Sequence, residues 1–210
     1  MKFSGIKSLR FLLIVNLIFG AALLRTVRQY NDFVHSSEEK EKEKVVALTK
    51  KAAQELGAIV AHVEERTKKM AAAFSKNSTP PVSDIKKQLA AELDSNEIFL
   101  GSGVLYAPYA YSKKIYLFGP YLHRSGKSYE FTDAGMVYDY TADTKKSKFF
   151  YNAFSQNQTA WSEPFWGEAS KKLVVTYSVP FYVNGDIEKP SGIIVNSISI
   201  DEIYNILSSL

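Results

Sequence analysis

The sequence predicts an α+β protein, in which one antiparallel sheet carries helices on its faces and follows a long N-terminal helix. Between residues 38 and 74 the chain has no Pro and one Gly, and its apolar residues recur every three or four positions. That spacing is the period of a helix. From residue 82 onward, short helical segments alternate with runs rich in β-branched and aromatic residues, the composition typical of strands. Short connections between successive strands favour antiparallel pairing.

The N-terminus has the order of an export signal. Three cations precede an apolar run that extends from Phe11 to Leu24. This run is shorter than the roughly 20 residues that span a bilayer core, but flanking Lys and Arg side chains lengthen the effective span. We expect residues 1–10 to be cytoplasmic and residues 11–30 to form a transmembrane signal anchor. The alternative is a cleaved signal peptide, with Gly20 and Ala22 before the cut.

The next segment, residues 36–75, is predicted to form a long stalk helix. Its first part, residues 38–44, is charged on every side and cannot be buried. The later part carries one apolar stripe close to the heptad period, which predicts packing against a sheet or against a second copy of the chain. A homodimer through this helix is therefore expected. Pro80 and Pro81 end it.

Residues 82–207 are predicted to form the folded domain. We expect helices at 84–93 and 143–156 and a further helix that begins at 201. Strands are expected at 98–106, 114–122, 135–141, 172–183 and 192–200, with a turn at 184–186 between the last two.

Composition and motifs argue against an enzyme. The chain has no Cys and three scattered His, and it contains no metalloprotease, phosphate-loop or serine-hydrolase string. We therefore expect no catalytic residues, no metal and no cofactor. The net charge of +4 comes from mixed Lys and Glu and not from a basic block, so a nucleic-acid partner is not expected either.

Three strings together resemble the Cache family of PAS-like extracytoplasmic sensor domains. They are Trp161-Ser162-Glu163-Pro164-Phe165, then Thr176-Tyr177-Ser178-Val179-Pro180-Phe181, then a Gly192-Ile193-Ile194-Val195 strand that runs into Ser199-Ile200-Asp201-Glu202-Ile203. Lys148-Phe149-Phe150-Tyr151 falls where many members have R-x-W-Y. The chain resembles the membrane-distal lobe of double Cache receptors. The resemblance implies a PAS-like antiparallel sheet flanked by helices.

The resemblance also implies a small-molecule site between the sheet and its covering helix and loops. Amino-acid-binding members hold the ligand carboxylate with the Arg and aromatic residues of R-x-W-Y, and the amino group with acids in two later positions. Here Lys148 replaces the Arg, and the later positions fall near Gly167 or Glu168 and at Ser197. A ligand ammonium needs an acidic partner in a dry pocket, so we expect a carboxylate in preference to an α-amino acid. The candidate ligand-binding residues are Lys148, Phe150, Tyr151, Trp166, Tyr177, Tyr138, Tyr106 and Ser197.

The resulting prediction is the periplasmic ligand-sensing domain of a bacterial inner-membrane receptor that acts in signal transduction. One alternative is a ligand-free Cache-like module that dimerises or binds a partner protein. Another is a type IV pilin-like subunit, although Arg10 stands where such subunits usually carry Glu.

Overall fold

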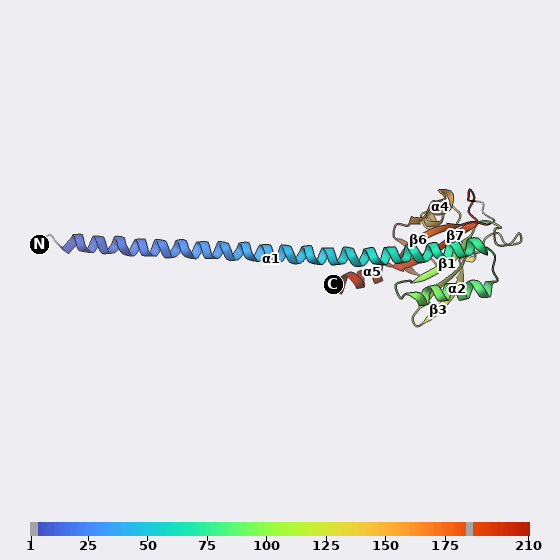
Figure 1. The fold of residues 1–210 in the computed structure, drawn as a ribbon, viewed down its shortest axis with the longest axis horizontal. Coiled ribbons are helices and arrows are strands. Elements are labelled where there is room, and N and C mark those ends of the chain that lie inside the picture. Colours follow the sequence, from blue (N-terminus) through green and yellow to red (C-terminus); the bar gives the residue numbers. More distant parts are fainter. Residues whose placement is uncertain (1–3, 184–186) are drawn as a thin grey trace. The chain divides into compact units, whose positions relative to one another are not determined.

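The computed structural model describes residues 4–183 and 187–210, with the side chains of 4–15 and of Ile18 outside the description. The helices are α1 (Ser4–Lys76), α2 (Val82–Ser95), α3 (Ala134–Val137), α4 (Lys148–Ser155) and α5 (Ile200–Ser208) (Figure 1). The strands are β1 (Gly101–Tyr106), β2 (Pro120–Ser125), β3 (Ser128–Asp133), β4 (Ala160–Trp161), β5 (Phe165–Gly167), β6 (Lys172–Phe181) and β7 (Gly192–Ser199). The chain divides into two units, residues 1–53 and residues 54–210.

The first unit contains helix and nothing else among its described residues. Its described side chains are almost all exposed, including Leu23, Phe33 and Val45. Part of the apolar run expected to anchor the chain, residues 11–15 and Ile18, lies outside the described side chains. Among the residues that were searched, no helix combines the length and apolar character needed to cross a membrane.

The second unit is built on one antiparallel sheet of order β3-β2-β1-β7-β6-β4, with β5 also paired to β6. Successive side chains of a strand point to opposite faces, so the register assigns each residue to a face. Thr176 pairs with Ser197, which pairs in turn with Gly101, and these three share one face. Their neighbours Tyr177 and Asn196 share the other. Every residue of β7 is buried, because both faces of the sheet are covered.

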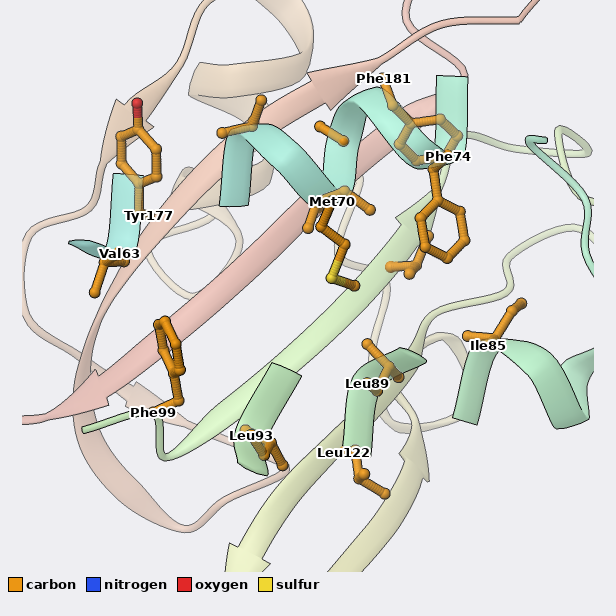
Figure 2. Packing of buried hydrophobic residues seen from close by; sticks show 14 of the residues in the cluster. Val63, Met70, Phe74, Ile85, Leu89, Leu93, Phe99, Leu122, Tyr177 and Phe181 are labelled. Atoms are coloured by element: carbon orange, nitrogen blue, oxygen red, sulfur yellow. The ribbon is translucent and has the colours of Figure 1, made fainter. Parts of the chain in front are cut away.

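The helix-covered face holds the larger core. Figure 2 shows Val63, Met70 and Phe74 from α1 and Leu89 from α2 directed toward the sheet. They meet strand residues that include Phe181, whose ring lies 5.9 Å from that of Phe74. The C-terminal part of the apolar stripe is thus buried within its own domain.

A second core lies on the opposite face, under α3, α4 and β5. Tyr140 and Phe150 are almost fully buried there, with ring centroids 5.0 Å apart. The Tyr140 hydroxyl donates to the carbonyls of Tyr106 (2.7 Å) and Phe118 (3.1 Å), which fixes the segment before α4 against the sheet.

The sequence located most of these elements. Helix 84–93 and strands 98–106, 172–183 and 192–200 correspond to α2, β1, β6 and β7, and the helix expected from residue 201 is α5. The helix expected at 143–156 is shorter, since α4 begins at Lys148 after the N-cap Ser147. Helix α1 passes through residue 36 without a break and ends at Lys76. The turn expected at 184–186 lies outside the described residues.

Two predicted strands were wrong. The strand expected at 114–122 is displaced to β2, because residues 107–116 form a loop closed by a hydrogen bond from Tyr109 N to Tyr116 O (2.8 Å). The strand expected at 135–141 is instead the helical turn α3 and a loop. Asp133 caps that turn, since its Oδ1 accepts from Gly135 N (3.0 Å) and Gly119 N (2.8 Å).

Gly192 permits the close approach of β7 to β1. A Cβ at this position would lie 2.3 Å from the Leu105 carbonyl oxygen. We expect Gly192→Ala to lower the free energy of unfolding by about 1–3 kcal/mol, as measured by urea denaturation followed by circular dichroism. Gly57→Ala is the matched control, because a Cβ there meets nothing within 4 Å and helix propensity predicts a gain of about 0.5–1 kcal/mol. Equal effects of the two changes would contradict this account.

Candidate functional site

A small inner cavity of about 40 Å³ lies on the sheet face opposite α1. Its floor is formed by strand residues and its cover by α3, α4 and the β5–β6 connection. The lining residues are Leu105, Tyr121, Ala134, Tyr138, Phe149, Phe165, Gly167, Glu168, Ala169, Ser170, Val174, Thr176, Val195 and Ser197. A cavity of this size holds about one or two water molecules.

Tyr121 is a large aromatic side chain in the wall of the inner cavity. Its ring lies across β1 over two glycines: a Cβ at Gly101 would fall 2.0 Å from the Tyr121 hydroxyl, and a Cβ at Gly103 would fall 2.8 Å from its ring. Tyr121 was not among the residues predicted from the sequence. The usable signal was the Gly101-Ser102-Gly103 string, which places two glycines on one face of a strand and leaves room for a neighbouring aromatic ring.

The polar groups of the inner cavity are mostly hydroxyls. Thr176 Oγ1 and Ser197 Oγ lie 2.9 Å apart across β6 and β7. Burial raises the pKa of Tyr121 to about 12, an effect that the neighbouring hydroxyls of Ser197 and Ser170 oppose. Burial also raises the pKa of Tyr138, and the Tyr121 and Glu168 side chains add to that shift. Both phenols therefore stay protonated and able to donate at neutral pH.

Glu168 is the one charged side chain among the residues that line this cavity. Its Oε1 is bonded to Lys146 Nζ, and its Oε2 lies 3.4 Å from Lys171 Nζ. The hydrogen bond from Lys146 is the main cause of its lowered pKa, followed by that from Lys171. The carboxylate is thus ionised and already paired.

A second, outer groove of about 650 Å³ lies beside the inner cavity. It is lined by Lys145, Lys146, Lys148, Phe149, Asn152, Trp161, Ser162, Glu163, Pro164, Phe165 and Trp166. Phe149 and Phe165 line both spaces and stack with centroids 5.1 Å apart and planes 10° apart. This stacked pair separates the hydroxyl-lined cavity from the lysine-lined groove.

The structure divides the predicted ligand residues into three groups: those that line the inner cavity, those that line the outer groove, and those that line neither space. Tyr138 and Ser197 line the inner cavity, while Lys148 and Trp166 line the outer groove. Phe150 and Tyr151 line neither space: Phe150 stacks on Phe154 in the core, and Tyr151 is exposed.

Tyr106 and Tyr177 also line neither the inner cavity nor the outer groove. They are on the helix-covered face, because side chains alternate along β1 and β6. The Tyr106 hydroxyl donates to the Ser78 carbonyl (2.8 Å), and the Tyr177 ring lies 5.1 Å from that of Trp161. The structure thus places both on the face opposite Tyr138 and does not bring the three into one pocket.

One groove residue reaches the long helix directly. Trp161, at the edge of the sheet, donates from Nε1 to Glu64 Oε1 of α1 (3.0 Å). Lys68 on the next turn bonds the same carboxylate through Oε2 (3.1 Å). These two hydrogen bonds lower the pKa of Glu64, and that from Trp161 is the larger cause. A change in the groove that moves Trp161 therefore acts on α1.

Comparisons with known proteins agree with this architecture. The extracellular domain of soHK1S-Z6, a protein named as a histidine kinase, is 25% identical in sequence to this chain and superposes on it with a TM-score of 0.67. The match covers 75% of this chain and 59% of that one. The ligand-binding domain of the Campylobacter jejuni chemoreceptor Tlp3 in complex with L-valine is 16% identical with a TM-score of 0.55, over 77% and 60%. A structure titled methyl-accepting chemotaxis protein X is 20% identical with a TM-score of 0.52, over 75% and 64%.

The chain spans about three fifths of the length of these solved domains. No curated protein sequence matches it. The model of the methyl-accepting chemotaxis protein-like, first PDC sensor domain matches residues 85–205, which is more than half of the chain. This match confirms the resemblance to the Cache sensors, and the chain belongs to the methyl-accepting chemotaxis protein-like family of first PDC sensor domains.

Proposed function

We propose that this chain is the extracytoplasmic sensory lobe of a membrane-anchored bacterial receptor, and that it binds a small carboxylate in the outer groove. The observation that carries the proposal is the hydrogen bond from Trp161 of the groove to Glu64 of α1. This bond joins the groove to α1, the helix that leads toward the N-terminal anchor. Binding of a ligand in the groove and the position of α1 therefore become linked.

The charges of the groove favour an anion. Lys145, Lys146 and Lys148 line it, against one carboxylate, Glu163. Because Lys146 is bonded to Glu168, Lys145 and Lys148 are the lysines that remain for a ligand. An α-amino acid fits less well, because Ser197 offers its ammonium a hydroxyl and both oxygens of Glu168 are held by lysines. The L-valine of Tlp3 is therefore not expected here.

The exposed part of α1 supports a homodimer. Val45 and Leu48 continue the apolar stripe but are exposed, whereas Val63 and Met70 of the same stripe are buried against the sheet. A second copy of the helix would cover the exposed positions with knobs-into-holes packing.

Lys148→Ala is expected to remove most of the carboxylate affinity. A ligand at a hundredfold excess over its Kd stabilises the folded state by about 2.7 kcal/mol, and removal of the cation removes most of that gain. The measurement is calorimetric thermal unfolding of the 210-residue chain in detergent micelles with acetate, butyrate, succinate and amino acids. Lys114→Ala, an exposed lysine outside the groove, is the control and should keep the shift. A shift with amino acids alone would refute the carboxylate assignment.

Trp161→Phe is expected to uncouple binding from α1. Because the chain has no Cys, a single spin label at Ala47→Cys reports the distance between paired copies of α1. We expect ligand to change this distance by about 1–2 Å in the parent and in Trp166→Phe, which alters the groove but leaves the Glu64 bond intact. In Trp161→Phe the ligand should bind and leave the distance unchanged. A preserved change there would argue against the Trp161 route.

The small inner cavity favours one competing function. A domain whose pocket is filled by Tyr121, Tyr138, Phe149 and Phe165 can serve as a ligand-free module that dimerises or binds a partner. The absence of a thermal shift with every compound of the panel, together with a stable dimer, would establish that alternative.

A further inference from the structure

The two spaces of the site differ in chemistry and share one wall. The outer groove is lined by three lysines and the inner cavity by the hydroxyls of Tyr121, Tyr138, Thr176 and Ser197. The stacked rings of Phe149 and Phe165 stand between them. Phe149 belongs to α4 and Phe165 to β5, so a small displacement of α4 from the sheet parts the pair.

The inner cavity suits an uncharged end of a ligand. A second carboxylate placed there would find no free cation, and burying an unpaired charge is costly. An ammonium would find hydroxyls and the paired Glu168. A hydroxyl or carbonyl oxygen would instead meet donors and acceptors that are already in place at Thr176 and Ser197, 2.9 Å apart.

We infer that the ligand is a short hydroxy- or oxo-carboxylate that passes between Phe149 and Phe165. Its carboxylate stays in the groove at Lys148, and its uncharged oxygen enters the inner cavity at Thr176 and Ser197. The cavity volume of about 40 Å³ admits a terminal group of about one or two non-hydrogen atoms. This inference rests on the proposed function and adds the class of ligand that the site selects.

Four probes of equal chain length test the inference: butyrate, 4-hydroxybutyrate, succinate and 4-aminobutyrate. They share one carboxylate and differ at the far end, which is methyl, hydroxyl, carboxylate or ammonium. Isothermal titration of the 210-residue chain in detergent micelles should show 4-hydroxybutyrate binding about threefold to tenfold more tightly than butyrate. Succinate and 4-aminobutyrate should bind more weakly than butyrate.

Ser197→Ala should reduce the ratio of the 4-hydroxybutyrate affinity to the butyrate affinity to about one. Ser102→Ala is the matched control, because Ser102 is equally buried but lies on the opposite face, near Met70 Sδ. Equal affinity for 4-hydroxybutyrate and butyrate, or a preference that survives in Ser197→Ala, would overturn the inference while Lys148-dependent binding upheld the proposed function. Tightest binding of succinate or 4-aminobutyrate would also overturn it. No binding of any probe would overturn both.

Discussion

Arg66→Met is expected to lower the free energy of unfolding by about 3 kcal/mol, because it leaves a buried carboxylate without its cation. Arg66 of α1 forms two bonds to Glu92 of α2, from Nη2 to Oε2 (2.6 Å) and from Nε to Oε1 (3.3 Å). The Glu92 side chain is 5% exposed and that of Arg66 is 28% exposed. The effect falls at the low end of the range for buried ion pairs, since water reaches the guanidinium.

The pair is part of a network that holds α1, α2 and the central strand together. Asn196 of β7 donates from Nδ2 to Glu92 Oε1 (3.1 Å) and to Thr67 Oγ1 of α1 (3.0 Å). Its neighbour Ser197 lies on the opposite face of the same strand, where it lines the inner cavity. The loss of Arg66 therefore disturbs the contact through which the sheet positions the helix.

Urea denaturation followed by circular dichroism measures the change. Lys69→Met, an exposed lysine on the same helix, is the control and should shift stability by less than about 0.5 kcal/mol. In a Glu92→Gln background the cost of Arg66→Met should fall to about 1 kcal/mol, because a neutral amide needs no cation. A cost that is the same in both backgrounds would show that the ion pair contributes nothing.

Tyr106→Ala is expected to cost about 3–5 kcal/mol of folding stability. Tyr106 is 1% exposed, and its ring packs edge-on against Phe181 at 5.4 Å and near Tyr111 at 5.1 Å. The substitution leaves a large cavity between β1 and the helices. Thermal unfolding by calorimetry measures the loss.

Tyr106→Phe separates packing from the hydrogen bond to Ser78. It should cost only about 1 kcal/mol and leave ligand affinity unchanged, since the residue is outside both the cavity and the groove. A large loss of carboxylate affinity in Tyr106→Phe, with stability preserved, would return Tyr106 to the ligand site.

The fold was more predictable than the site, for a physical reason. Long apolar strands such as β6 and β7, and the helical period of α1, are local signals that a sequence displays directly. β3 was missed although half-buried Tyr129 and Phe131 alternate with exposed Ser128 and Glu130, because this alternation extends over only a short segment. It is held by the two-residue turn at Gly126, which has a φ of +61°, and by pairing with β2.

The site depends on which face each residue takes, and that follows from register. Tyr106 and Tyr177 are aromatic and adjacent to site residues in the sequence, but one step along a strand moves a side chain to the other face. Tyr121 was not predicted although it lies within the strand expected at 114–122, because the face that it takes depends on the pairing of β2 with β1. The replacement of Arg by Lys148 and of an acid by Ser197 could be read from the resemblance to the Cache family, and both residues line the site.

Both tryptophans of this protein, Trp161 and Trp166, line the outer groove. Intrinsic fluorescence excited at the indole band therefore reports on this one region and on no other part of the chain. Trp166 is 52% exposed, so its emission responds to what enters the groove, whereas the Trp161 indole is bonded to Glu64 and responds to the helix. Ligand arrival and helix response can thus be followed separately, without a label, in the Trp161→Phe and Trp166→Phe variants.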